Sequence, residues 1–288
     1  MFKLLIKKIK DISILKTIYG LISSDVQYSK VKSILNENRK YKDRYKGKRC
    51  FIIGNGPSLN NHNLRLLQGE YLFSVNSMTI TKEFDMLKPN FHVMVDSTRF
   101  DENNDIFQQN MRDLVKKKDL PICIFPVRFK NYLEKFGFDK KLEIIYVYPL
   151  ARTKRIERID FTRKVPPYQN VVNIALYTAI YLGFTEIYLI GCDMTGFVSI
   201  YDEKDDINYG SHFYEEKNKK EVKYMKKLHK ERTNEFMLKA YGYVFELFRL
   251  TQDYALKNNI KIYNATKGGA LDVFPRIKYE KLFNEKNK

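Results

Sequence analysis

The stretch Arg49–Leu59 reads Arg-Cys-Phe-Ile-Ile-Gly-Asn-Gly-Pro-Ser-Leu, and it decides the fold class of this chain. Four apolar residues, Cys50 to Ile53, follow one another and stop at a glycine. A short continuous apolar run of this kind is typical of a strand that is buried on both faces of a parallel sheet. We therefore expect the first strand of an α/β domain here.

The residues after this strand predict a turn into a helix. Gly54 and Gly56 have no Cβ and can adopt positive φ, so a ligand could approach their backbone closely. Pro57 suits the first turn of a helix, where Asn55, Gly56 or Ser58 could supply a capping oxygen or open N–H groups. Such a turn is an anion site in many α/β proteins, and an ordinary tight turn without a ligand is the alternative.

The rest of the chain alternates between strand-like and helix-like segments. We expect strands at 49–53, 71–75, 91–95, 122–126, 143–148, 186–191 and 261–263. We expect helices near 58–67, 79–87, 106–116, 131–136, 171–182 and 222–257. This alternation predicts a Rossmann-like, doubly wound and mostly parallel sheet, with ligands at the carboxyl ends of the strands.

The expected organisation has three parts. Residues 1–45 form amphipathic basic helices, 46–194 and 258–288 form the nucleotide-binding core, and 195–257 form a lid loop and a long helix. Apolar residues recur at helical spacing between Phe2 and Ile22, with lysines interleaved. This segment could lie on a membrane surface or pack against the core or a second copy of the chain.

Composition restricts the partners and the compartment. The net charge of +18 favours polyanions such as phosphorylated substrates, anionic lipid surfaces or nucleic acid, although a solvated basic surface is the alternative. Cys50, Cys123 and Cys192 lie in apolar runs without metal-ligand spacing, which indicates buried thiols in a reducing compartment. No signal-peptide pattern or bilayer-spanning apolar run is present, so we expect a cytoplasmic protein, peripheral on the inner face of the cell membrane. We also expect a homo-oligomer.

Polar residues follow several of the predicted strands, and the carboxyl ends of parallel strands meet at one edge of a sheet. With Asn55 they would offer amide and carboxylate groups to a nucleobase or a ribose. Each one alone could instead cap a helix. These residues are Asn76, Asp96, Ser97, Gly191, Asp193 and Thr195.

At this point the chain resembles a known family. The run Gly54–Leu59 after an apolar strand is similar to the opening motif of the bacterial lipooligosaccharide sialyltransferases. Asn76 matches that family's second nucleotide-contacting asparagine, and Ala179–Asp193 resembles its helix–strand unit. The opening motif is shared with the proteins similar to 6-hydroxymethylpterin pyrophosphokinase MptE. The likeness extends over roughly 49–214 and implies a glycosyltransferase A-like variant of the fold.

The resemblance also implies a reaction. It implies inverting transfer of a sialic acid or related nonulosonic acid from a CMP-activated donor to a sugar hydroxyl, with no obligatory cofactor or metal. Tyr201 falls where the family has a tyrosine that binds the departing phosphate, and Thr195 stands where a first tyrosine is expected. Ser211-His212-Phe213 resembles the family's Ser-His-Tyr, while the position of its general base is occupied by Glu216. His212 and Glu216 are therefore both candidate bases.

Further substrate contacts are expected outside this region. The basic stretch 151–168, and Arg152 in particular, could supply cations for the leaving phosphate, or it could be a solvated surface. Asn264, Thr266 and Arg276 lie near a second glycine pair after the last strand and could contact the donor or the acceptor. An ordinary closing turn is the alternative.

Three functions remain open. The first is a transferase that uses a CMP-linked nonulosonate, acts on a glycan acceptor that could be lipid-linked, and binds no nucleic acid. The second is a pterin-type diphosphokinase that uses ATP and Mg²⁺, and the third is a non-enzymatic basic protein that binds polyanions. No Asp-x-Asp pair ends a strand, and the acidic residues of 202–206 are more typical of a solvated loop than of a metal site. We therefore expect no metal ligands.

Overall fold

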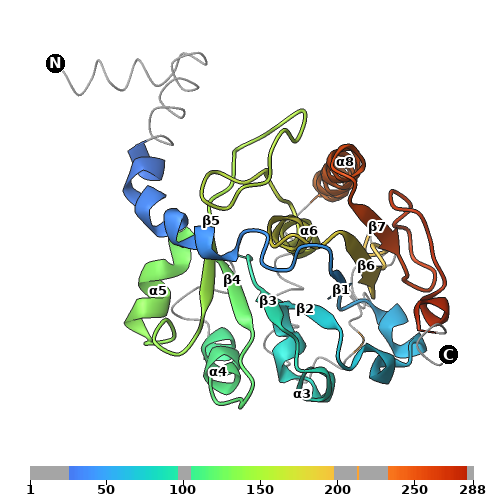
Figure 1. Cartoon of the computed structure of the whole chain (residues 1–288), viewed down its shortest axis with the longest axis horizontal. Coiled ribbons are helices and arrows are strands. Elements are labelled where there is room, and N and C mark those ends of the chain that lie inside the picture. Colours follow the sequence, from blue (N-terminus) through green and yellow to red (C-terminus); the bar gives the residue numbers. More distant parts are fainter. Residues whose placement is uncertain (1–25, 97–104, 198–212, 214–232, 284–288) are drawn as a thin grey trace.

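The computed structural model describes residues 26–96, 105–197, 213 and 233–283. Seven strands form one sheet in the order β5-β4-β3-β2-β1-β6-β7, and every paired strand is parallel to its neighbour. Helices cover both faces of this sheet (Figure 1). The expected doubly wound α/β fold is therefore confirmed.

The strands lie where the apolar runs predict them, within two residues at either end. They are β1 (Arg49–Ile53), β2 (Tyr71–Val75), β3 (Phe91–Val93), β4 (Ile122–Pro126), β5 (Ile144–Val147), β6 (Glu186–Ile190) and β7 (Lys261–Asn264). β1 and β4 are almost entirely buried, because helices pack against both faces of the sheet at these positions. The three cysteines are buried and unpaired, as their apolar surroundings predict.

Two hydrophobic clusters, one on each face, hold the layers together. The first joins the sheet to α6 (Val171–Tyr181) and α8 (Asn234–Lys257). The second joins it to α3 (Lys82–Leu87), α4 (Asp105–Leu114) and α5 (Lys130–Lys135). Short 3-10 helices complete the layers: η1 (Glu37–Tyr41), η2 (Pro57–Asn61), η3 (Leu64–Leu67), η4 (Asn76–Ile80), η6 (Val127–Phe129) and η8 (Tyr279–Leu282).

The prediction of an α-helix over 58–67 is wrong. The chain forms η2 and η3 there, separated by His62 and Asn63. The Asn63 side chain accepts a hydrogen bond from the backbone of Arg65 and caps η3, so the segment restarts instead of continuing one helix. Likewise, the predicted helix 79–87 divides into η4 and α3, because the Thr81 side chain caps a new helix at Phe84 N–H.

The segment before β1 is part of the core. Residues 26–36 are helical, and Asn38 and Tyr41 of η1 are buried. The Asn38 side-chain amide donates to the backbone carbonyls of Tyr146 and Phe161, and the backbone carbonyl of Asn38 accepts from the Tyr181 hydroxyl. These bonds fix the entry of the chain beside α6. The N-terminal amphipathic segment, 1–22, lies outside the described residues.

Within the described part of the chain, no helix combines the length and the apolar composition that crossing a membrane would need.

Candidate functional site

The strand order places the topological switch point of the sheet at the carboxyl ends of β1 and β6, and we call this position the crevice. Strands β2 to β5 extend to one side of β1, whereas β6 and β7 extend to the other, so the winding reverses between β1 and β6. Ligands of open α/β sheets bind at such a switch point. The glycine turn after β1 lies at this position, as the sequence predicts.

The two glycine turns of the switch point pack against one another. Gly54 N–H donates to the carbonyl of Ile190 and Gly56 N–H to the carbonyl of Gly191, both at 2.8 Å. A Cβ on Gly54 would lie 2.3 Å from the Gly191 oxygen. Neither Gly54 nor Gly56 uses the positive φ that glycine can adopt, and it is Gly191 that takes φ +62°. These glycines therefore serve the close approach of two backbones, whereas the sequence suggested the approach of a ligand.

The open groups after the turn are occupied by a carboxylate of the chain itself. Asp193 accepts hydrogen bonds from Ser58 N–H at 3.2 Å and from the Ser58 hydroxyl at 2.7 Å. A Cβ on Gly56 would overlap this carboxylate, at 1.8 Å from Oδ2. Because η2 is a single short 3-10 turn that starts at Pro57, it does not offer the N-terminus of a long helix to a phosphate. Asp193 instead ties the turn after β6 to the turn after β1.

Two asparagines at neighbouring strand ends keep unpartnered oxygens. The Asn55 side chain is 9% exposed and donates to the Val75 carbonyl at 3.1 Å, which leaves its Oδ1 buried without a partner. Asn76 follows Val75 directly, adopts φ +49°, and also holds a buried Oδ1 without a partner. Buried polar atoms without partners are rare in native folds and indicate a missing hydrogen-bond donor. The structure thus brings the two predicted asparagines to one edge of the sheet, and the side-chain oxygen of each can still accept a hydrogen bond.

Other polar groups lie along the same edge. Thr79 is buried with its hydroxyl unpartnered, and Asp96 follows β3 as an exposed carboxylate. Met194 adopts φ +53° directly after Asp193, a conformation that strains a long side chain. Ser97 lies outside the described residues.

Arg128 is a candidate residue that the sequence analysis did not identify. It follows β4, and its guanidinium donates to the Val95 carbonyl at 3.4 Å, beside the end of β3. Burial raises the pKa of Tyr168 to about 12 and the charge of Arg128 opposes this, so the two side chains are neighbours. The sequence feature that could have identified Arg128 is an arginine that closely follows a buried strand. It provides a positive charge at the carboxyl edge of the sheet.

The predicted contacts after β7 are engaged in holding their own loop. The Thr266 hydroxyl accepts from Cys192 N–H at 3.1 Å, and the Asn264 side chain bonds to Leu271 O and Thr266 N–H. The Arg276 guanidinium donates to four backbone carbonyls between Thr266 and Leu271. The loop in turn reaches the crevice, because Ala270 N–H donates to Asp193 O at 2.7 Å.

His62 connects η2 to the same loop. Its Nε2 accepts from Lys267 N–H at 3.3 Å, its Nδ1 is buried without a partner, and its ring meets Tyr279 edge-on. Burial lowers the pKa of His62 below the ordinary value. The charge of Glu280 opposes this shift and that of Lys267 reinforces it. A neutral imidazole is therefore favoured here.

The residues predicted to carry out the chemistry, Tyr201, His212 and Glu216, lie outside the described residues. Their neighbour Phe213 is described: its N–H donates to Asn55 O at 2.9 Å, and its carbonyl accepts from the Asn60 amide at 3.1 Å. The chain next to His212 is thus fixed against the glycine turn. Thr195 is exposed. Arg152 lies near Tyr243 of α8: burial raises the pKa of Tyr243, and the charge of Arg152 opposes this shift.

No group of three His, Cys, Asp or Glu side chains within the described ranges is placed to hold a metal ion. The acidic stretch 202–206 lies outside those ranges.

Comparison with known proteins defines the family. The family model described as 6-hydroxymethylpterin diphosphokinase MptE-like matches residues 25–196. This match extends over more than half of the chain and includes β1 to β6 with both glycine turns. The chain belongs to this MptE-like family. No curated protein shows significant sequence similarity to it.

Solved structures with a similar arrangement include two of one sialyltransferase. The sialyltransferase CST-II with a trisaccharide acceptor and CMP is 15% identical, with a TM-score of 0.45 over 80% of this chain and 86% of that chain. CstII from Campylobacter jejuni with CMP is 14% identical, with a TM-score of 0.42 over 79% of this chain and 84% of that one.

Proposed function

We propose that this protein is a glycosyltransferase that binds a CMP-activated sugar in the crevice between β1 and β6. The donor would be a sialic acid or a related nonulosonic acid, and the acceptor a sugar hydroxyl of a surface glycan. The observation that carries the proposal is the pair of unpartnered amide oxygens on Asn55 and Asn76 at adjacent strand ends. An exocyclic amine or a ribose hydroxyl is the kind of donor that would satisfy them.

The surrounding charges suit a nucleotide monophosphate. Asp193 already occupies the N–H and hydroxyl groups of Ser58, so the phosphate of a bound nucleotide would need other partners. Arg128 offers a positive charge at the same edge of the sheet, and Tyr201 would offer a hydroxyl. Hydrogen-bond donors aimed at the departing phosphate stabilise the charge that develops as the glycosidic bond breaks.

In the proposed reaction, a base removes the proton of the acceptor hydroxyl as its oxygen attacks the anomeric carbon of the sugar. The bond from that carbon to the phosphate oxygen breaks on the opposite side, and CMP leaves with the bonding electrons. His212 is the proposed base, because an imidazole has an ordinary pKa near ~6.5 and can accept a proton at neutral pH. Glu216 is the substitute. The hydrogen bonds that join Phe213 to Asn55 and Asn60 support this assignment, since they hold the residue that follows His212 in the sequence beside the glycine turn.

A diphosphokinase that uses ATP and Mg²⁺ is the second candidate, because the matching family model carries a diphosphokinase description. The same crevice would then hold ATP. The two functions differ in the nucleotide bound and in the need for a divalent ion, which binding measurements can separate.

We also propose that the protein acts at the inner membrane surface and as a homo-oligomer. The basic amphipathic segment 1–22 supports the first part of this proposal. Flotation with anionic vesicles tests it: the full chain should float, and a variant with Lys3, Lys7 and Lys8 replaced by Gln should not. Equal flotation of both proteins would remove the membrane role of this segment.

Substitution of His212 tests the proposed chemistry. The His212→Ala variant should keep its affinity for CMP and lose transfer by roughly 10²–10⁴-fold, the usual contribution of a positioned base. Transfer is measured as CMP release from a CMP-sialic acid donor in the presence of an oligosaccharide acceptor. His229→Ala is the matched control, since it removes a histidine from the same segment of the chain. Full turnover in His212→Ala would assign the base role to Glu216 or to another group.

A further inference from the structure

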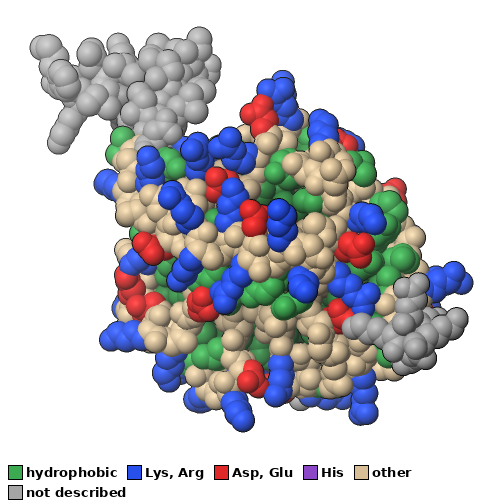
Figure 2. All heavy atoms as spheres, in the orientation of Figure 1, with side chains coloured by type: hydrophobic (Ala, Val, Ile, Leu, Met, Phe, Trp, Pro, Cys, Tyr) green, Lys and Arg blue, Asp and Glu red, His purple; other side chains and the backbone are tan. Residues whose placement is uncertain are grey.

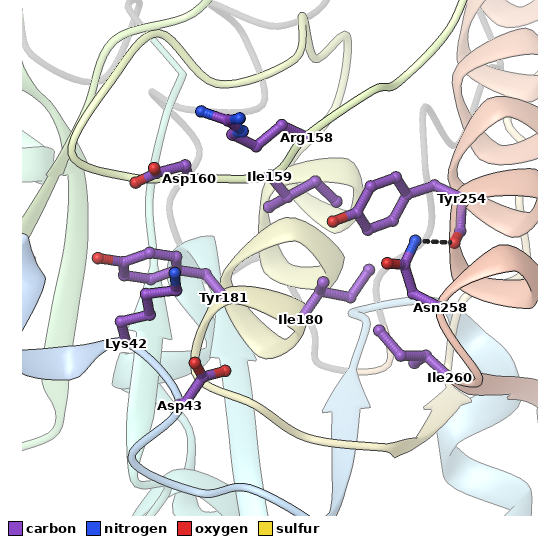
Figure 3. A pocket seen from close by; sticks show the side chains of 10 residues that line it. All are labelled: Lys42, Asp43, Arg158, Ile159, Asp160, Ile180, Tyr181, Tyr254, Asn258 and Ile260. Carbon is purple, nitrogen blue, oxygen red and sulfur yellow. Dashed lines mark hydrogen bonds between the residues drawn. The ribbon is translucent and has the colours of Figure 1, made fainter.

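A cavity of about 410 Å³ opens at the edge of the sheet opposite the glycine turns. It lies between the C-terminal ends of α6 and α8, the segment after η1, and the basic stretch 151–168. Its lining residues, drawn in Figure 3, are Lys42, Asp43, Arg158, Ile159, Asp160, Ile180, Tyr181, Tyr254, Asn258 and Ile260. The volume is in the range of small-molecule sites, and the position separates it from the proposed nucleotide crevice.

The helix ends beside the cavity offer nothing to a cation. The last carbonyls of α6 accept hydrogen bonds from the chain itself, including Asp43 N–H to Tyr181 O and Tyr45 N–H to Leu182 O. At the end of α8, Tyr254 O accepts from the Asn258 amide and Ala255 O from Ile260 N–H. The acceptors that the negative end of a helix normally presents are therefore already used.

Two cations of the lining, Lys42 and Arg158, are exposed and form no direct ion pair with a described residue, although the charge of Lys42 acts on Asp160. The carboxylate of Asp160 is held by Thr162, through its N–H at 2.9 Å and its hydroxyl at 2.7 Å. Burial alone would raise the pKa of Asp160, but these bonds and the charges of Lys42 and Arg163 lower it. Asp160 thus stays ionised within its own turn and leaves the Arg158 guanidinium without an ion pair.

The rest of the lining suits a hydroxylated ring. Tyr254 and the Asn258 amide oxygen face the cavity in Figure 3, and three isoleucines line its apolar part. The carboxylate of Asp43 makes no hydrogen bond within the described part of the chain, so it can accept from a hydroxyl. An aromatic side chain beside acceptors for hydroxyl groups is a suitable surface for a sugar or polyol ring.

We propose that this cavity is a second binding site, distinct from the nucleotide crevice, for a phosphate carried on a hydroxylated ring. The phosphate would lie between Lys42 and Arg158, and the ring hydroxyls would bond to Asp43 and Asn258. The ligand could be a free sugar phosphate or the headgroup of a phosphorylated glycolipid, since both present the same chemistry. Lys and Arg side chains are spread over the visible face of the molecule (Figure 2), and this positive charge would attract such an anion to the protein.

Calorimetric titration of the full chain with glucose 6-phosphate tests the proposal. The wild-type protein should bind it, and Lys42→Ala and Arg158→Ala should each weaken binding by about tenfold, as expected for one charge-assisted hydrogen bond. Arg155→Ala is the matched control, because Arg155 belongs to the same stretch, carries the same charge, is exposed and pairs with Glu157 instead of lining the cavity. It should bind like the wild type.

Two further arms separate the sources of the ligand and the contribution of the ring. Inorganic phosphate should bind about tenfold more weakly than glucose 6-phosphate, because it lacks the ring. Vesicles of phosphatidylcholine with phosphatidylinositol 4-phosphate test the lipid source, and retention that depends on Arg158 but not on Arg155 would assign it. The absence of sugar-phosphate binding together with vesicle retention that does not depend on Arg158, an equal loss in all three variants, or equal affinity for inorganic phosphate would each overturn the proposal. CMP binding, measured on the same proteins, should be unchanged.

Discussion

At the scale of single residues, the crevice is organised by a carboxylate that the protein supplies itself. Asp193 binds the N–H and the hydroxyl of Ser58, and its backbone carbonyl accepts from Ala270 N–H. It therefore links the turns after β1, β6 and β7 at one point. Hydrogen bonds to a charged acceptor contribute about 1.5–3 kcal/mol each when well formed.

Replacement of Asp193 should show this role in the stability of the fold. Asp193→Asn should lower the free energy of unfolding by about 1–3 kcal/mol, because the charge is lost and one oxygen becomes an amide donor facing Ser58 donors. Urea unfolding measures the change, with Asp272→Asn as a control on an exposed carboxylate of the neighbouring loop. If Ser58→Ala and Asp193→Asn act additively in a double-mutant cycle, the two side chains do not stabilise one another and the linking role is wrong.

His62 predicts a pH dependence of stability. Its pKa is lowered in the folded protein, so the unfolded chain binds the proton more readily below pH ~6.5. The stability associated with the neutral ring is present above that pH and lost as the pH falls toward and through the lowered pKa. The loss in free energy of unfolding between pH 7.5 and 5.5 should therefore be smaller in His62→Gln, which keeps an acceptor for Lys267 N–H. An equal loss in both proteins would show that other groups govern this range.

At the scale of elements, the strands were predictable and the segments after them were less so. An apolar run such as Cys50–Ile53 predicts a buried strand, and β1 forms where this run lies. The helices predicted over 58–67 and 79–87 both divide into shorter ones, because the side chains of Asn63 and Thr81, respectively, bond to nearby backbone N–H groups and cap a new helix. Sequence spacing could place Asn55 and Asn76 at one edge of the sheet, but it could not show that the Asp193 carboxylate accepts the hydrogen bond of the Ser58 hydroxyl.

Replacement by alanine should have opposite effects on stability at two glycines, one in the contact between the glycine turns and one on an open face of α8. Gly191→Ala should destabilise the protein by about 1–3 kcal/mol, because φ is +62° and the new Cβ would lie 2.8 Å from Gly54 O. Gly242→Ala should stabilise it by about 0.5–1 kcal/mol, since that glycine lies in α8 with open space around it. Thermal unfolding of both variants measures the difference. Equal stability of Gly191→Ala and the wild type would mean that the turns do not need this close approach.

At the scale of the whole molecule, the two edges of the sheet carry different chemistry. The carboxyl edge brings together the asparagines, Arg128 and the anchored Phe213, while the opposite edge opens into the cavity at Lys42 and Arg158. The sequence predicted the doubly wound sheet and the polar edge because both follow from strand order and strand ends. It could not predict the cavity, since its lining comes from four separate stretches of the chain.

The central claim is that the crevice at the ends of β1, β2 and β6 binds a cytidine phosphate, and isothermal titration with CMP in the absence of Mg²⁺ tests it most directly. The wild-type protein should bind CMP, and Asn55→Ala and Asn76→Ala should each weaken binding at least about tenfold, since an unsatisfied buried group costs about 1–3 kcal/mol. Asn90→Ala, which removes an asparagine bonded to Leu72 N–H at the other edge of the sheet, should leave CMP affinity unchanged. Unchanged CMP affinity in both crevice variants, or binding of ATP with Mg²⁺ in place of CMP, would contradict the account.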